Sequence, residues 1–225
     1  MTRRFFVNAA AATAVASNAS AKPALLGGAP VRTEPFPSWP KITAVDEEAW
    51  MKILRSGKWY RGSQAQEFET AYAKLTGAKH CLATANGTSA LITSLGALGI
   101  GPGDEVLVPP YTFVATVNAV LLHHALPVFI DTHPETFQMD ARKIGDAITD
   151  NTKAIIPVHV GGSAADLDAI LEIGNRRKIP TLKDACQAHV GQWPSVAAIS
   201  GFYTRRVPQR PGIRARPETR HTRIC

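Results

Sequence analysis

The sequence predicts an α/β fold in which a mostly parallel sheet is covered by helices on both faces. Between residues 80 and 184, short apolar runs of β-prone residues alternate with longer segments that carry a helical pattern. Residues able to bind a ligand follow three of these runs, at the strand ends where open α/β sheets bind their ligands. The 225 residues are 45% hydrophobic, which is typical of a globular chain with a sizeable core.

The first 21 residues are interpreted as an export signal. Arg3 and Arg4 precede an Ala-rich, weakly apolar stretch and a small-residue cleavage site at residues 19–21, a pattern that resembles a twin-arginine signal. The stretch is too short and too polar to span a membrane. We therefore expect an exported or periplasmic protein. The alternatives are a disordered Ala-rich leader and a cytoplasmic location.

Residues 22–62 are predicted to form an extended arm followed by a helix. Prolines spaced through residues 23–40 argue against a helix there. Residues 46–56 then read as a helix, with acidic residues in the first turn and Gly57 after the end. The next helix is predicted at residues 63–76, where Ser63 and Gln66 fit a capping box.

A turn at Asn86 and Gly87 marks the first candidate ligand element. It follows a strand-like run at residues 80–85 and leads into an apolar helix. The backbone N–H groups and the positive end of the helix dipole favour a phosphate at such a turn. Thr88 and Ser89 add hydroxyl donors. An ordinary helix N-cap is the alternative explanation.

The second candidate element is residues 109–116, which include aromatic residues and follow the β-prone run at residues 106–108. An aromatic side chain at a strand end can lie against a flat cofactor ring, although a core position is the alternative. His159 follows a later predicted strand. It is interpreted as a pocket-lining residue, and a structural histidine is the alternative. The intervening strands and helices are predicted, in chain order, at residues 126–131, 140–149, 153–158 and 165–177.

The segment 181–189 carries the third candidate element. Asp184 ends a short buried strand, and Gln187 and His189 follow it closely. Because side chains alternate along a strand, Lys183 is expected to point away from the face that Asp184 uses. The alternative is that Asp184 only caps the next helix. The three cysteines have no metal or redox spacing, so no metal site is predicted.

Residues 194–225 differ in composition from the rest of the chain. They hold seven arginines, one glutamate and no lysine, and so carry six of the seven net positive charges. Such an Arg/Pro-rich segment cannot build a core, and we expect it to be disordered. The basic charge is therefore no argument for a nucleic-acid partner of the folded part.

Residues 184–189 resemble the Asp-Ala-Ala-Gln-Ala-His element of the DegT/DnrJ/StrS sugar aminotransferases. Residues 87–91 are similar to the Gly-Thr-Ser-Ala-Leu element of that family, and His159 with Gly162 fits its His-x-x-Gly. The resemblance implies the three-layer large domain of pyridoxal-phosphate (PLP) enzymes of fold type I, present in part at residues 63–193. It also implies roles for individual residues: Gly87, Thr88 and Ser89 for the phosphate, Phe113 for the ring face, Asp184 for the ring nitrogen, Gln187 for the ring hydroxyl, and His159 and His189 as pocket residues.

The resemblance further implies transfer of an amino group, commonly from glutamate, to a keto sugar carried by a nucleotide. A homodimer is expected, without nucleic-acid or membrane partners. The resemblance ends at about Trp193, and no later residue matches the Schiff-base lysine of the family. We therefore expect this chain to be inactive, with residues 194–225 read from a shifted frame. The alternatives are a non-catalytic binding protein and a PLP-dependent sugar dehydratase, a branch in which histidine replaces the lysine.

Overall fold

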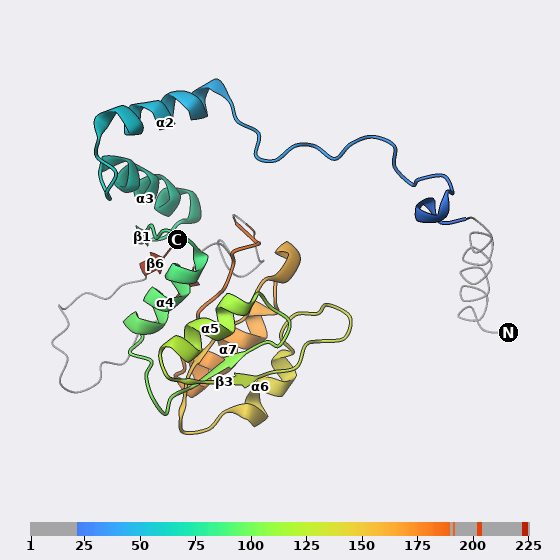
Figure 1. Cartoon of the computed structure of the whole chain (residues 1–225). Coiled ribbons are helices and arrows are strands. Elements are labelled where there is room, and N and C mark those ends of the chain that lie inside the picture. The colour runs from blue at the N-terminus through green and yellow to red at the C-terminus, as the bar shows by residue number, and fades with distance from the viewer. Residues whose placement is uncertain (1–21, 190, 192–201, 204–221, 225) are drawn as a thin grey trace. The chain divides into compact units, whose positions relative to one another are not determined.

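The computed structural model describes residues 22–189, 191, 202–203 and 222–224, and the chain divides into two compact units at Trp59 and Tyr60 (Figure 1). The predicted export signal and most of the predicted tail lie outside these residues. No helix in the described ranges is long and apolar enough to cross a membrane.

The first unit contains an extended arm and one long helix. After the short 3-10 turn η1 (Ala24–Leu26), the Arg32 guanidinium lies over the Phe36 ring, 4.8 Å from its centre. Helix α2 (Ala44–Ser56) begins with a capping box, in which Asp46 accepts hydrogen bonds from the backbone N–H and the hydroxyl of Thr43. No residue of α2 is buried by the described part of the chain.

The second unit is built on three parallel strands in the order β3-β2-β4 (Leu126–Phe129, Glu105–Val108 and Thr152–Ile155). Two isolated parallel bridges, Ile155 to Thr181 and Val158 to Asp184, continue this sheet beyond β4. The predicted strand before Asp184 is therefore only a pair of bridges. Pro157 and Pro180 explain the interruption, because neither can donate a backbone hydrogen bond to the ladder.

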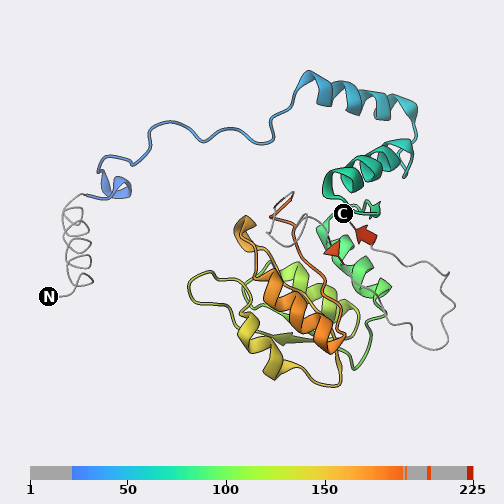
Figure 2. The ribbon, with the colours of Figure 1, turned by 180° about the vertical axis from the view of Figure 1, so that it is seen from behind.

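Helices cover both faces of this sheet, as the opposite views of Figures 1 and 2 show. Val106, Val108 and Ile156 point to one face and pack with helices α4 (Gly87–Ala97) and α5 (Val114–Leu122). Leu107 and Ile155 point to the other face and pack with α6 (Ala141–Ala147) and α7 (Leu167–Arg177). This alternation gives the predicted three layers.

A helix and a short strand precede α4 in the second unit. Helix α3 (Ser63–Thr76) spans the predicted residues, but its N-cap is Gly62 and no side chain caps it. The capping box predicted for Ser63 and Gln66 is therefore wrong, because the Gln66 N–H donates to the Gly62 carbonyl from inside the helix. Strand β1 (His80–Leu82) pairs in parallel with β6 (Thr222–Ile224), and β6 pairs antiparallel with β5 (Phe202–Tyr203).

Gly174 allows α7 to pack closely against the chain that leads to Asp184. A Cβ atom added at Gly174 would lie 2.8 Å from Thr181 Oγ1 and 2.9 Å from the Ile179 carbonyl oxygen. We expect Gly174→Ala to lower the free energy of unfolding by about 1–3 kcal/mol, measured by urea denaturation, because the backbone near Thr181 must move.

Gly145→Ala is the matched control, because the added Cβ in α6 would meet no atom within 4 Å. It should leave stability unchanged or raise it by about 0.5–1 kcal/mol through helix propensity. Equal effects of the two substitutions would contradict the close packing at Gly174.

Candidate functional site

A cleft of about 490 Å³ opens at the carboxyl ends of the parallel strands. Residues from four segments line it: Gly87, Thr88 and Leu91; Tyr111, Thr112, Phe113 and Ala115; Val158, His159 and Val160; and Asp184, Cys186 and Gln187. Six of the eight residues predicted from the sequence thus lie together: Gly87, Thr88, Phe113, His159, Asp184 and Gln187. Ser89 and His189 are not among the lining residues.

The N-terminus of α4 forms one end of the cleft. Asn86 is the N-cap, and its side-chain oxygen accepts the Ser89 N–H at 2.9 Å. This bond uses the backbone N–H of Ser89, whereas the sequence analysis assigned the Ser89 hydroxyl to a ligand. Position 87 requires glycine, because a Cβ atom there would lie 2.7 Å from Cys186 Sγ. The first N–H groups of a helix have no partner within the helix, so this end of the cleft favours an anion.

The Asp184 carboxylate is held on both of its oxygens at the floor of the cleft. The Thr116 hydroxyl donates to Oδ2 at 2.9 Å, and the Cys186 N–H donates to Oδ1 at 3.3 Å. Thr116 is linked in turn to Thr112, with 2.8 Å between the two hydroxyl oxygens. Asp184 is only 5% exposed, so this network fixes the direction of a buried acceptor.

The Cys186 thiol beside this carboxylate is a poor nucleophile. Burial of the sulfur, and then the negative charge of Asp184, raise the pKa of Cys186 to about 12. At neutral pH the sulfur therefore stays protonated and acts as a packing group against Gly87.

His159 is fully buried and neutral. Its Nδ1 accepts the Ala165 N–H at 3.0 Å, so the ring proton is on Nε2. Burial, and then the charge of Lys183, lower the pKa of His159 to about 4. Nε2 is the one buried side-chain nitrogen or oxygen of the described residues without a hydrogen-bond partner. This donor belongs to a residue that lines the cleft.

Aromatic side chains border the cleft. Phe113 precedes α5 and is 71% exposed, so it is not the core residue that the sequence also allowed. Tyr111 meets Phe137 edge to face, with 6.1 Å between the ring centres. His189 lies elsewhere: its Nδ1 is 3.0 Å from the hydroxyl of Tyr72 on α3.

Sequence reasoning missed Thr112 and Thr116. Thr112 lies just before the N-cap of α5 and Thr116 lies in its first turn, and two threonines spaced across a helix start are the signal that could have found them. The cleft lining includes no lysine. Lys183 is buried on the opposite side of its segment, as predicted from strand alternation. No cluster of metal-ligating side chains occurs in the described ranges.

Residues 40–201 match the DegT/DnrJ/EryC1/StrS aminotransferase family. The chain belongs to this family. It is 42% identical, over 173 residues, to the L-glutamine:2-deoxy-scyllo-inosose aminotransferase of Streptomyces lividus, a match that covers 74% of this chain and 41% of the relative. The chain thus spans about two fifths of the length of the curated relatives that it matches.

Solved structures confirm the predicted fold class for part of a domain. The crystal structure of 3-amino-5-hydroxybenzoic acid synthase superposes with a TM-score of 0.70 at 36% identity, covering 73% of this chain and 44% of that one. NtdA from Bacillus subtilis, solved with the bound cofactor pyridoxamine phosphate (PMP), gives a TM-score of 0.61 at 40% identity, with coverage of 63% and 32%. The cofactor expected from the resemblance is thus present, in its amine form, in a relative.

The buried His159 predicts a loss of stability in acid. Its pKa is lower in the folded chain than in the unfolded chain, so the unfolded state binds more protons between about pH 6.5 and pH 4. The stability that the neutral ring contributes should therefore disappear as the pH falls through this window. From pH 7 to pH 4.5 this residue alone should lower the free energy of unfolding by about 2 kcal/mol.

His159→Gln tests this expectation, because glutamine does not titrate but retains an acceptor for the Ala165 N–H. Urea unfolding at pH 7, 5.5 and 4.5 should show that the free energy of unfolding falls less steeply with falling pH in the variant than in the wild type. If the free energies of the two proteins fall equally, His159 does not titrate in this window.

Proposed function

We propose that this chain forms the cofactor-binding part of a PLP-dependent aminotransferase that acts on a cyclic polyhydroxy ketone. The observation that carries the proposal is the position of the Asp184 carboxylate. It is fixed by Thr116 and by the Cys186 N–H, and it lines the same cleft as the N-terminus of α4. A buried acceptor and an anion site in one cleft suit a ligand with a basic ring and a phosphate.

The cleft residues fit PLP in size and in chemistry. A volume of about 490 Å³ lies in the usual range for a small-molecule site. Gly87 and Thr88 offer N–H groups to the phosphate, and Phe113 offers an aromatic face to the ring. The unpartnered Nε2–H of His159 is a buried donor that a bound ligand or water would satisfy.

Each residue has a separate task in this proposal. Asp184 holds the proton on the ring nitrogen, because a carboxylate beside that nitrogen raises its pKa. Thr116 and Thr112 hold the carboxylate in place, and Gln187 donates to the ring hydroxyl. The neutral His159 adds no positive charge that would compete with the ring proton. When bound, the cofactor supplies an electron sink for the carbanion formed on the substrate.

The substrate and the amino donor are proposed from the relatives. The Streptomyces lividus enzyme is named for L-glutamine and for 2-deoxy-scyllo-inosose, which is a cyclic polyhydroxy ketone. We propose an amino donor of the glutamate or glutamine type and a keto sugar or keto cyclitol as the acceptor. A nucleotide on the acceptor and a homodimer stay predictions from the family resemblance.

We further propose that these 225 residues bind the cofactor without turning over substrate. The last lysine of the chain is Lys183, which is buried away from the Asp184 side, and no lysine lines the cleft. Reading the coding DNA beyond codon 185 in all three frames tests the origin of residues 194–225. A Ser-x-x-x-x-Lys segment in another frame would support a shifted frame, and its absence would favour a non-catalytic binding protein.

PMP binding is the direct test, because PMP needs no lysine. The purified chain should bind PMP in a fluorescence titration, and Asp184→Asn should weaken binding by about tenfold or more through loss of the charge-assisted hydrogen bond. Asp150→Asn is the control, since Asp150 is exposed on the turn before β4. Equal affinities of the wild type and Asp184→Asn would refute the proposed site.

A further inference from the structure

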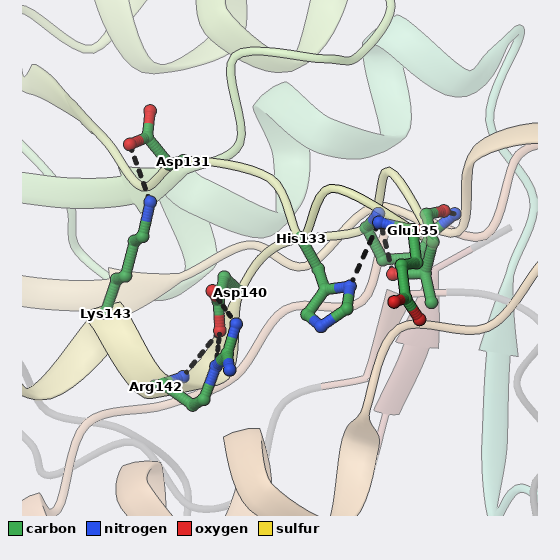
Figure 3. A network of polar contacts seen from close by, with 8 residues as sticks. Asp131, His133, Glu135, Asp140, Arg142 and Lys143 are labelled. Carbon is green, nitrogen blue, oxygen red and sulfur yellow. Dashed lines mark hydrogen bonds and ion pairs between the residues drawn. The ribbon is translucent and has the colours of Figure 1, made fainter. Parts of the chain in front are cut away.

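The loop between β3 and α6 is held firmly at both ends (Figure 3). Near its start, Asp131 forms an ion pair with Lys143, with 2.8 Å between Oδ2 and Nζ. At its end, Asp140 accepts three hydrogen bonds from Arg142, one from the backbone N–H and two from the guanidinium. These bonds lower the pKa of Asp140 to about 2, so the carboxylate is charged at neutral pH. Backbone hydrogen bonds cross the loop, from the His133 N–H to the Gln138 carbonyl at 2.8 Å and from the Asp140 N–H to the Asp131 carbonyl at 3.0 Å, and these bonds fix the position of Gln138.

Gln138 is a polar residue that this loop buries, next to the buried Met139. Its side chain is directed to the backbone of Val160: Nε2 donates to the Val160 carbonyl at 3.2 Å, and Oε1 accepts the Val160 N–H at 3.3 Å. Gln138 is only 4% exposed. One amide thus pairs with both backbone groups of a residue that lines the cleft, as a neighbouring strand would.

Val160 begins a short 3-10 turn, η2 (Val160–Gly162), that reaches Gln187 on its other side. Gly161 and Gly162 have φ angles of 65° and 80°, a region that favours glycine. The Gly161 N–H donates to Gln187 Oε1 at 2.6 Å. Two glutamine amides, from distant parts of the sequence, therefore bond to neighbouring residues of this turn.

We infer that Gln138 is a positioning residue that sets the direction of the Gln187 amide in the cleft. An amide that presents its oxygen to the Gly161 N–H has its NH₂ group left to donate elsewhere. Gln187 lines the cleft, so this group is available to the ring hydroxyl oxygen of the cofactor. The inference rests on the proposed function, because it concerns the orientation of the Gln187 amide toward the ring hydroxyl of the proposed cofactor.

The direction of this amide matters because its two ends have opposite character. If the turn shifted, the Gln187 amide could rotate and present Oε1 to the cleft, and an acceptor would then face the ring oxygen. Gln187 itself is exposed, so packing alone does not fix its rotation. The bonds from Gln138 to Val160 hold the turn that carries the Gly161 donor.

The test compares two ligands on one variant. Gln138→Met keeps the length of the side chain and removes both hydrogen bonds to Val160. Affinity for PMP, measured by fluorescence titration, should fall by about fivefold or more. Affinity for 3-deoxy-PMP, which lacks the ring hydroxyl, should be the same in the variant and the wild type. Gln64→Met, at an exposed position of α3, is the matched control.

Equal losses for PMP and 3-deoxy-PMP would overturn the inference, because they would show a purely structural role for Gln138. An unchanged PMP affinity would also overturn it. If Gln138→Met does not fold, Gln187→Met gives the same comparison and must lose affinity for PMP alone. The proposed function is tested separately by Asp184→Asn, whose effect must be present for both ligands.

Discussion

The cleft depends on one stretch of parallel backbone pairing, between residues 157–159 and Asp184. The Asp184 N–H donates to the Pro157 carbonyl at 2.9 Å, and the His159 N–H donates to the Asp184 carbonyl at 3.0 Å. This pairing brings together two segments that α7 separates in the sequence. It also fixes the alternation of side chains, so that Asp184 lines the cleft while Lys183 is buried on the other side.

The polar groups beside this pairing differ in whether they already have hydrogen-bond partners. The Asp184 carboxylate already has a donor on each oxygen, so its position does not depend on a ligand. His159 Nε2 has no partner among the described residues, and a buried donor in that state costs about 1–3 kcal/mol. A rigid acceptor beside an unsatisfied donor is the arrangement expected of a site that is formed before its ligand arrives.

Local sequence patterns predicted the layers and the strand ends that form the cleft, because alternation and helix boundaries are set by neighbouring residues; the roles of individual cleft residues were implied only by the family resemblance. The turn at Asn86 and Gly87, the strand ends and Asp184 were all accessible in this way. Gln138 was not, because its role depends on a backbone contact 22 residues away. Ser63 was misread as a cap, since Gly62 can also begin a helix and leaves no side-chain signal. The interruptions at Pro157 and Pro180 turned an expected strand into two bridges.

The residues that line the cleft lie in a part of the fold that has its own core. Apolar residues from α4 and α5 on one face, and from α6 and α7 on the other, are buried against the three central strands. These contacts lie within the two fifths of the relatives' length that the chain spans. The contacts proposed for the phosphate and the ring nitrogen therefore rest on a core that the described residues build themselves. Moving a proton on the substrate needs a further base, and apart from Asp184 and Tyr111 the ionisable groups that line this cleft are a neutral histidine and a protonated thiol. The described lining therefore supports the proposal of cofactor binding, and it offers no lysine for turnover.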